Sequence, residues 1–201
     1  MYKKTGGVTF CLFGDGAINQ GSFNEALNMA GLYKVPAIFI VENNGVAMGT
    51  QVARASAEKD LAKRGDCYAM PFRHIDGNDI DTVIAEMSKA VERGRRGEGP
   101  SYIVANTYRF RGHSMSDAMK YRTKEEMEQA KQRDPISIYQ VRLRDKGLLS
   151  DEQAEAIAEE VAEIVSDAVR QADADPQPKL EDRFDDILAE KYPYEPDAGR
   201  D

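Results

Sequence analysis

Two short, continuous apolar runs predict buried strands near the start of the chain, at residues 8–13 and 37–41. Between them, apolar positions spaced along one face predict a helix from about residue 22 to residue 33, with Ser22 as its N-cap. Continuous apolar strands separated by a helix are typical of a βαβ unit in a parallel sheet.

The pattern continues after a less regular stretch, in which residues 53–64 are expected to hold a short helix. Further along the chain, two strands are expected at residues 72–76 and 101–107, with a helix at residues 79–93 between them. Residues 108–121 are polar, contain a glycine and show no period, so they predict an ordered loop. A loop of that length inside a compact domain is usually functional or mobile.

The last third of the chain predicts helices. Thr123 with Glu126, and Ser150 with Gln153, match the capping-box pattern that opens a helix. A further helix is expected from Pro135 to near Gly147. We therefore expect an α/β fold with helices on both faces of a parallel sheet and a helical C-terminal extension. The predicted division is an α/β domain at 1–122 and an extension at 123–201, packed on the same domain.

Composition excludes several classes of protein. The net charge is −8, and Lys and Arg form no long basic run, which argues against a nucleic-acid partner. No apolar stretch approaches the ~18–20 residues that a membrane span needs, and no apolar signal segment opens the chain. The two cysteines form no CxxC pair, and Cys11, inside an apolar run, is expected to be buried. The chain is accordingly expected to be intracellular.

Oxygen-bearing side chains follow two of the predicted strands. Gly14-Asp15-Gly16 ends the first strand, and Asn43-Asn44 ends the second, one βαβ crossover later. Because parallel strands present their carboxyl ends at one edge of the sheet, the two segments are expected to meet there. The carboxylate of Asp15, the amide oxygen of Asn44 and the carbonyl of Val46 would suit Mg²⁺, which also binds phosphate oxygens.

Each of these motifs alone is also a common turn sequence. Their pairing at crossover spacing is what favours a Mg²⁺-diphosphate site, with Gly14 and Gly16 allowing close backbone approach and the amides of Gly16 and Ala17 adding anion binding. This reasoning does not identify the diphosphate.

Three longer strings carry a family resemblance. They are GDGAINQGSFNEALNMA at 14–30, ENNGVAMGT at 42–50, and YRFRGHSMSD at 108–117 followed by YRT at 121–123. They resemble the α subunit of the E1 component of 2-oxoacid dehydrogenase complexes, a thiamine-diphosphate family, and the third string is most similar to the members that act on pyruvate. The resemblance covers residues 8–180. Relatives carry a large region before the first string, so the chain is expected to be N-terminally truncated.

The resemblance assigns roles to individual positions. Asp15, Asn44 and the Val46 carbonyl match the Mg²⁺ ligands of the family. The positions that match its contacts to thiamine diphosphate are Gly14, Asp15, Gly16, Ala17, Asn44, Val46 and His113. His113 matches a histidine that contacts the diphosphate and helps in transfer of the acyl group. Ser114 matches a residue that is phosphorylated in mitochondrial relatives.

The implied activity is oxidative decarboxylation of pyruvate with acetyl transfer to the lipoyl domain of E2. The implied assembly is an α₂β₂ heterotetramer with an E1 β subunit, in a bacterial cytoplasm or, in a eukaryote, a mitochondrial matrix. Branched-chain 2-oxoacids and acetoin remain alternative substrates, and a non-catalytic fragment that only pairs with the β subunit remains an alternative function. The loop arginines Arg109, Arg111 and Arg122 are expected either to bind phosphate or the acidic surface of a lipoyl domain, or to brace the loop by ion pairs.

Overall fold

The computed structural model describes residues 5–185 of the 201-residue chain. It divides into two compact units, Met1–Leu148 and Leu149–Asp201. The first unit holds a four-stranded parallel sheet in the order β1-β2-β6-β5. These strands are Thr9–Gly14 (β1), Ala37–Asn43 (β2), Phe72–Asp76 (β5) and Ser101–Asn106 (β6). The predicted parallel α/β architecture is confirmed.

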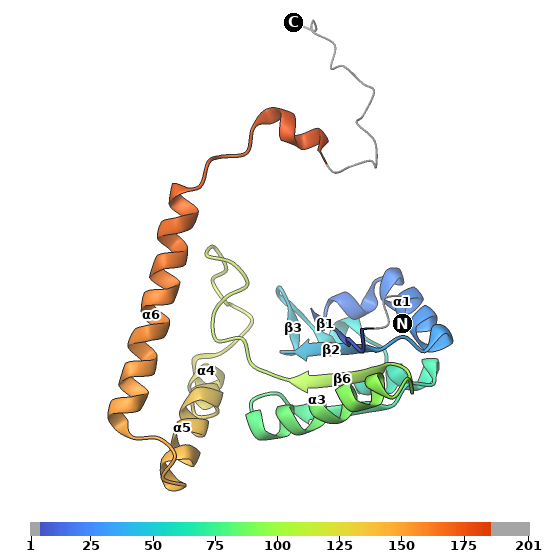
Figure 1. Ribbon diagram of the computed structural model, residues 1–201, viewed down its shortest axis with the longest axis horizontal. Coiled ribbons are helices and arrows are strands. Elements are labelled where there is room, and N and C mark those ends of the chain that lie inside the picture. Colours follow the sequence, from blue (N-terminus) through green and yellow to red (C-terminus); the bar gives the residue numbers. More distant parts are fainter. Residues whose placement is uncertain (1–4, 186–201) are drawn as a thin grey trace, which may run out of the picture. The chain divides into compact units, whose positions relative to one another are not determined.

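Helices cover both faces of this sheet. Figure 1 shows α1 (Gly21–Tyr33) and α3 (Ile80–Arg95) on opposite sides of the strands. The first of them packs together with two 3₁₀ helices, η1 (Ala17–Asn19) and η2 (Leu61–Tyr68). The second packs on β2 and β5. The result is the three-layer arrangement that continuous apolar strands require, because both of their faces need a cover.

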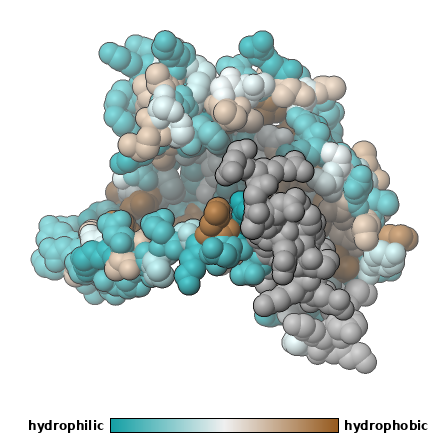
Figure 2. All heavy atoms as spheres, turned by 90° about the horizontal axis from the view of Figure 1, so that it is seen from above, coloured by the Kyte–Doolittle hydropathy of each residue, from teal (hydrophilic) through white to brown (hydrophobic). Residues whose placement is uncertain are grey.

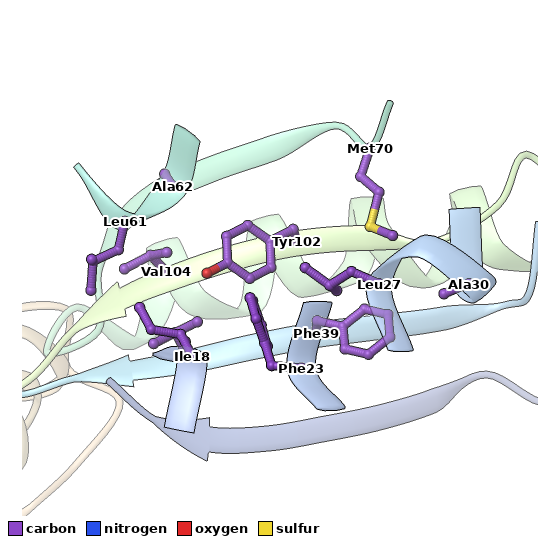
Figure 3. Close-up of a cluster of buried hydrophobic side chains, with 11 residues drawn as sticks. Ile18, Phe23, Leu27, Ala30, Phe39, Leu61, Ala62, Met70, Tyr102 and Val104 are labelled. Carbon is purple, nitrogen blue, oxygen red and sulfur yellow. The ribbon is translucent and has the colours of Figure 1, made fainter. Parts of the chain in front are cut away.

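Alternate residues of β2 belong to different hydrophobic clusters. Phe39 and Val41 join the cluster under α1, which also holds Phe23, Leu27 and Tyr102 (Figure 3). Ile38 and Ile40 join the cluster under α3. Since successive side chains of a strand point to opposite faces, β2 contributes equally to the two layers of the core.

β1 differs from the sequence prediction. It forms where expected, but most of its residues are exposed, with Phe10 45% and Leu12 58% accessible. Cys11, predicted to be buried, is exposed as well. The reason is position: β1 pairs with β2 along one side, and the helix on the Phe10 and Leu12 face packs on β2 and β5 instead. The expectation of a buried first strand was therefore wrong.

Several smaller features were misjudged or missed. The N-cap of α1 is Gln20, with no side-chain cap, so the predicted Ser22 cap was wrong. Residues 53–64 are divided between α2 (Val52–Ala55) and the start of η2. A two-residue hairpin, β3 (Val46–Ala47) with β4 (Thr50–Gln51), was not predicted. Its turn contains Met48 at φ 54°, in the left-handed region.

The helices of the last third match the prediction closely. In the first unit these are α4 (Lys124–Lys131) and α5 (Pro135–Asp145), and the Thr123–Glu126 capping box of α4 is formed. In the second unit, α6 (Asp151–Ala174) begins with the Ser150–Gln153 capping box, and η3 (Leu180–Phe184) follows. The prediction of a domain boundary at residue 122 stays a prediction.

One face of the described part of the chain is mainly hydrophilic. In Figure 2 polar residues dominate the visible described surface, and apolar side chains appear only in separate groups. None of the helices within residues 5–185 combines the length and the apolar character needed to cross a membrane.

Candidate active site

The carboxyl ends of the strands form the edge on which the candidate site is built. In the register of the sheet, Gly14 lies beside Glu42, and Asn43 lies beside Asn106. The side chain of Asn43 donates a hydrogen bond of 2.9 Å to Asn106 Oδ1, which ties the ends of β2 and β6 together. The structure therefore brings Asp15 and Asn44, the residues just after β1 and β2, to one edge, as the crossover spacing predicts.

Asp15 is the most distinctive side chain at this edge. It is only 3% exposed, although the strand that precedes it is open to solvent. Its Oδ2 atom is buried and has no hydrogen-bond partner among the described residues. Burial raises the pKa of Asp15, while its own backbone N–H, the positive charge of Arg109 and the N–H of Gly16 act in the opposite direction. A buried carboxylate oxygen without a partner is costly, and a bound cation would satisfy it.

Gly16 is required where it stands. A Cβ atom built on Gly16 would lie 2.6 Å from the Cβ of Ala47, in the β3–β4 hairpin. The Gly-Asp-Gly turn and the hairpin are thus in direct contact, and the backbone next to Asp15 has no room for a side chain. By contrast, a Cβ atom on Gly14 would meet nothing within 4 Å. Gly16 and Ala17 lie at the start of the short η1, and α1 begins only at Gly21.

Asn44 and Val46 lie in a tight turn beside this contact. The amide oxygen of Asn44 accepts a hydrogen bond of 3.3 Å from the N–H of Val46, and Gly45 between them has φ 81°. Val46 itself is buried, at 8% exposure. The turn fixes the position of the Asn44 side chain, which is the second predicted metal ligand.

The donor set restricts which metal would fit. Residues 5–185 contain no group of three or more His, Cys, Asp or Glu side chains that could hold a metal ion. A metal at this edge would therefore depend on Asp15 together with amide and carbonyl oxygens, the hard ligands that suit Mg²⁺ in partnership with phosphate oxygens and water. The buried Oδ2 atom of Asp15, which has no hydrogen-bond partner within residues 5–185, fits such an ion.

The loop that follows β6 is fixed to the same edge by two arginines. Arg122 donates to the carbonyl oxygens of Arg109 (2.7 Å) and Asn44 (3.3 Å), and its guanidinium lies 4.0 Å from the centre of the Tyr108 ring. Arg109 donates to the carbonyl of Met48 at 3.3 Å. Of the two roles predicted for the loop arginines, these contacts support bracing, although they are hydrogen bonds to carbonyls and not the ion pairs that were predicted. Arg111 is exposed.

Inside the loop, Asp117 organises the segment that carries His113. Its carboxylate accepts hydrogen bonds from the N–H of His113 (2.8 Å), from the N–H of Met119 (2.9 Å) and from the hydroxyl of Tyr121 (2.7 Å). The His113 N–H first, then the Tyr121 hydroxyl and the Met119 N–H, lower the pKa of Asp117 to about 2. Sequence reasoning missed Asp117 and Tyr121, because their role depends on how the loop folds.

His113 lies exposed on this loop, and its Nδ1 atom is 3.3 Å from a guanidinium nitrogen of Arg109. Ser114 is also exposed, and its hydroxyl lies 3.1 Å from that of Ser116. Gly112 is needed for this fold of the loop, since a Cβ atom there would lie 2.8 Å from the carbonyl oxygen of Asp117.

The sequence is similar to one family of known proteins over most of its length. A profile of the family described as "Dehydrogenase E1 component" matches residues 1–181. The pyruvate dehydrogenase E1 component subunit alpha of Rhizobium meliloti is 45% identical over 188 residues, which are 93% of this chain and 54% of that protein. The mitochondrial subunit alpha of Sminthopsis macroura is 41% identical over 196 residues, 96% of this chain and 53% of that protein. A chloroplastic subunit alpha-3 of Arabidopsis thaliana is 41% identical over 183 residues, 91% of this chain and 43% of that protein. The chain spans about half the length of the curated relatives that it matches.

Proposed function

Since this chain belongs to the dehydrogenase E1 component family, we propose that it is the part of a pyruvate dehydrogenase E1 α subunit that binds Mg²⁺ and the diphosphate of thiamine diphosphate. The observation that carries the proposal is the buried Asp15 carboxylate, whose Oδ2 atom lacks a partner among the described residues at the carboxyl edge of a parallel sheet. The names of the relatives support pyruvate as the substrate.

Thiamine diphosphate, when bound, supplies the electron sink for decarboxylation of the 2-oxoacid. The share of this chain is to bind and orient it. Asp15, Asn44 and the carbonyl of Val46 would hold Mg²⁺, and Gly14, Gly16 and Ala17 would lie against the diphosphate. His113 would donate a hydrogen bond to the bound cofactor at the same edge. It lies on the loop that Arg109 and Arg122 hold in place through hydrogen bonds to the carbonyls of Met48 and Asn44. The proposed partners are an E1 β subunit, in an α₂β₂ assembly, and the lipoyl domain of E2.

The test is calorimetric titration of thiamine diphosphate into the complex of this chain with an E1 β subunit, once with Mg²⁺ and once with EDTA. We expect binding that depends on Mg²⁺, and loss of at least about 100-fold in affinity, or roughly 2.8 kcal/mol, in Asp15→Asn. The matched control is Asp76→Asn, which removes a carboxylate at the end of β5 that pairs with Arg133 at 2.8 Å. This control is expected to bind as the unaltered complex does.

Two outcomes would contradict the proposal at different levels. If Asp15→Asn retains its affinity, the assignment of the metal ligand is wrong, although the complex still binds the cofactor. If a correctly assembled complex with the unaltered chain binds no thiamine diphosphate, the alternative function, pairing with the β subunit without catalysis, replaces the proposal.

A further inference from the structure

Arg109 makes a contact with His113 that the proposed site does not explain. One terminal guanidinium nitrogen, Nη1, lies 3.3 Å from His113 Nδ1. The other, Nη2, donates to the Met48 carbonyl at 3.3 Å and to the Tyr121 hydroxyl at 3.0 Å. Arg109 is therefore held by the β3–β4 turn and by the loop at once, and it reaches the imidazole as a fixed group rather than as a swinging side chain.

The chemistry of the contact allows only one direction. A guanidinium has N–H donors and no acceptor, so the imidazole nitrogen that it touches must accept. A neutral imidazole has one nitrogen that donates and one that accepts, and the partner of one nitrogen decides the state of the other. With Nδ1 accepting from Arg109, the single proton of neutral His113 is on Nε2.

The backbone of His113 is fixed by the same network. Tyr121, which accepts from Arg109, donates its own hydroxyl proton to Asp117, and Asp117 accepts the N–H of His113. The hydrogen bonds thus form a closed ring that runs from Arg109 through Tyr121 and Asp117 to the His113 backbone, and back to Arg109 through the imidazole. The links through Tyr121 and Asp117 constrain the backbone of His113, whereas the direct contact with Arg109 decides which ring nitrogen carries the proton.

We propose that Arg109 is a positioning residue that holds His113 in the tautomer protonated on Nε2, so that this residue presents an N–H donor to an anionic or carbonyl oxygen of a ligand. The purpose of that donor rests on the proposed function, but the tautomer itself rests on the contacts within this chain. A histidine locked in this way donates a hydrogen bond to a phosphate or carbonyl oxygen and cannot take up a proton on Nδ1 without losing its bond to Arg109.

The chain offers its own reference, because it contains only two histidines. The Nδ1 atom of His74 lies 3.8 Å from Oδ1 of Asp60, which is too far for a hydrogen bond. His74 therefore serves as the reference ring, since among the described residues no arginine contact like that of His113 fixes its tautomer. The two histidine signals are assigned with His74→Gln and compared in one sample.

The experiment is two-bond ¹H–¹⁵N correlation NMR of the ring nitrogens in the full 201-residue chain at pH 8, where an ordinary imidazole is neutral. We expect His113 to show protonated Nε2 and unprotonated Nδ1. In Arg109→Met the Nδ1-protonated form should appear, and the ¹⁵N shifts of the two ring nitrogens should move toward each other. His113 protonated on Nδ1 in the unaltered chain, or unchanged shifts in Arg109→Met, would overturn the inference.

Two further variants separate a direct effect from loosening of the loop. Tyr121→Phe removes the hydroxyl that anchors Arg109 to Asp117 but keeps the guanidinium beside His113, so the tautomer should persist. Arg111→Met removes a neighbouring, exposed arginine and should leave both shifts in place. If either variant produces the Arg109→Met spectrum, the inference fails.

Because the spectra are recorded without cofactor, the two proposals fail separately. A fixed Nε2–H tautomer in a chain whose complex binds no thiamine diphosphate would support the role of Arg109 and overturn the proposed function. Mg²⁺-dependent cofactor binding together with an unlocked His113 would do the reverse.

Discussion

β1 and β2 have closely similar apolar sequences, TFCLFG and AIFIVEN, and are paired residue by residue over their length. Nevertheless, four consecutive residues of β2, from Ile38 to Val41, are buried, while the register partners Phe10 and Leu12 of β1 are about half exposed. The difference arises outside the strands. β2 has strands on both sides and helices on both faces, whereas β1 pairs with β2 on one side and contributes no residue to the hydrophobic cluster under α3.

The comparison shows that a continuous apolar run identifies a strand but does not decide its burial. Strand formation depends on local propensity and on a pairing partner, both of which β1 has. Burial depends on which strands and helices lie around it, which is a property of the whole sheet. In an ordinary α/β core both faces of a parallel strand are covered, and the exposed apolar face of β1 does not follow this rule.

The largest expected effect on stability comes from shortening, to alanine, two side chains that lie opposite each other on β2 and β1. Ile40 is 6% exposed and lies beside Leu12, which is 58% exposed. Ile40→Ala should lower the free energy of unfolding by about 2–5 kcal/mol, because it leaves a cavity between β2 and α3. Leu12→Ala should change it by no more than about 0.5 kcal/mol. Urea unfolding of the two variants measures both values, and equal losses would show that β1 is covered in solution.

The next largest effect concerns Gly14, the last residue of β1, and Gly16, two residues later. Gly16→Ala should lower the free energy of unfolding by about 1–3 kcal/mol, since its Cβ would overlap the Cβ of Ala47, while Gly14→Ala has open space. Adding Ala47→Gly to Gly16→Ala should restore much of the loss, because the overlapping methyl group is then absent. Unfolding curves of the three variants are the measurement. A Gly14→Ala loss as large as that of Gly16→Ala would contradict the contact.

A smaller effect is expected from pH. Asp15, the residue that follows the exposed strand β1, has a buried carboxyl group. The folded pKa of Asp15 is raised above 3.8, so its contribution to stability is fully present below that pH and is lost as pH rises through the raised value. Without metal, Asp15→Asn should thus be more stable than the unaltered chain at pH 7, and this advantage should shrink as pH falls toward 3.8. Urea unfolding in EDTA at several pH values tests the sign.

The pKa of Asp117 is shifted in the direction opposite to that of Asp15. Its folded pKa is lowered to about 2, so its contribution is present above 3.8 and is lost as pH falls through about 2. Asp117→Asn should therefore speed amide exchange at His113 at neutral pH, with no gain in stability. A loss of stability in Asp15→Asn at pH 7 would contradict the effect of burial at Asp15, and a gain in Asp117→Asn would contradict the role of its hydrogen bonds.

The smallest effect is chemical and changes no stability. Cys11 on β1 and Cys67 in η2 are both exposed, so a thiol reagent should label two groups in the folded chain at similar rates. The single variants Cys11→Ala and Cys67→Ala assign the two reactions. Slow labelling of Cys11 in the free chain would mean that β1 is protected. Protection of Cys11 that arises only in the complex with a β subunit would place β1 near the partner.

Much of the fold follows from local sequence alone. Both capping boxes form as predicted, because Thr123 with Glu126 and Ser150 with Gln153 satisfy backbone N–H groups within four residues. The strand at Phe72–Asp76 also has the predicted bounds. The placement of Asp15 and Asn44 at one edge of the sheet was predictable as well, because parallel strands present their carboxyl ends at the same edge.

What the sequence could not show depends on contacts between distant segments. The turn that carries the buried Asp15 contacts Ala47 at Gly16, and Ala47 lies in a hairpin too short to give a periodic signal. The roles of Asp117 and Tyr121 arise only when the loop folds back on itself. The family resemblance predicted His113 as a functional residue, but neither it nor the residue pattern indicated that Arg109 would set the state of its ring.

The exposed strand also has a practical consequence for work with this chain. Among the described residues, β1 pairs through its backbone only with β2, so its other edge presents unpaired N–H and C=O groups. The six residues of β1 include neither a charged residue nor a proline, the features by which natural proteins discourage strand addition at an open edge. Another extended chain can therefore add there as a fifth strand, and we expect the protein to self-associate through β1 when it is concentrated alone.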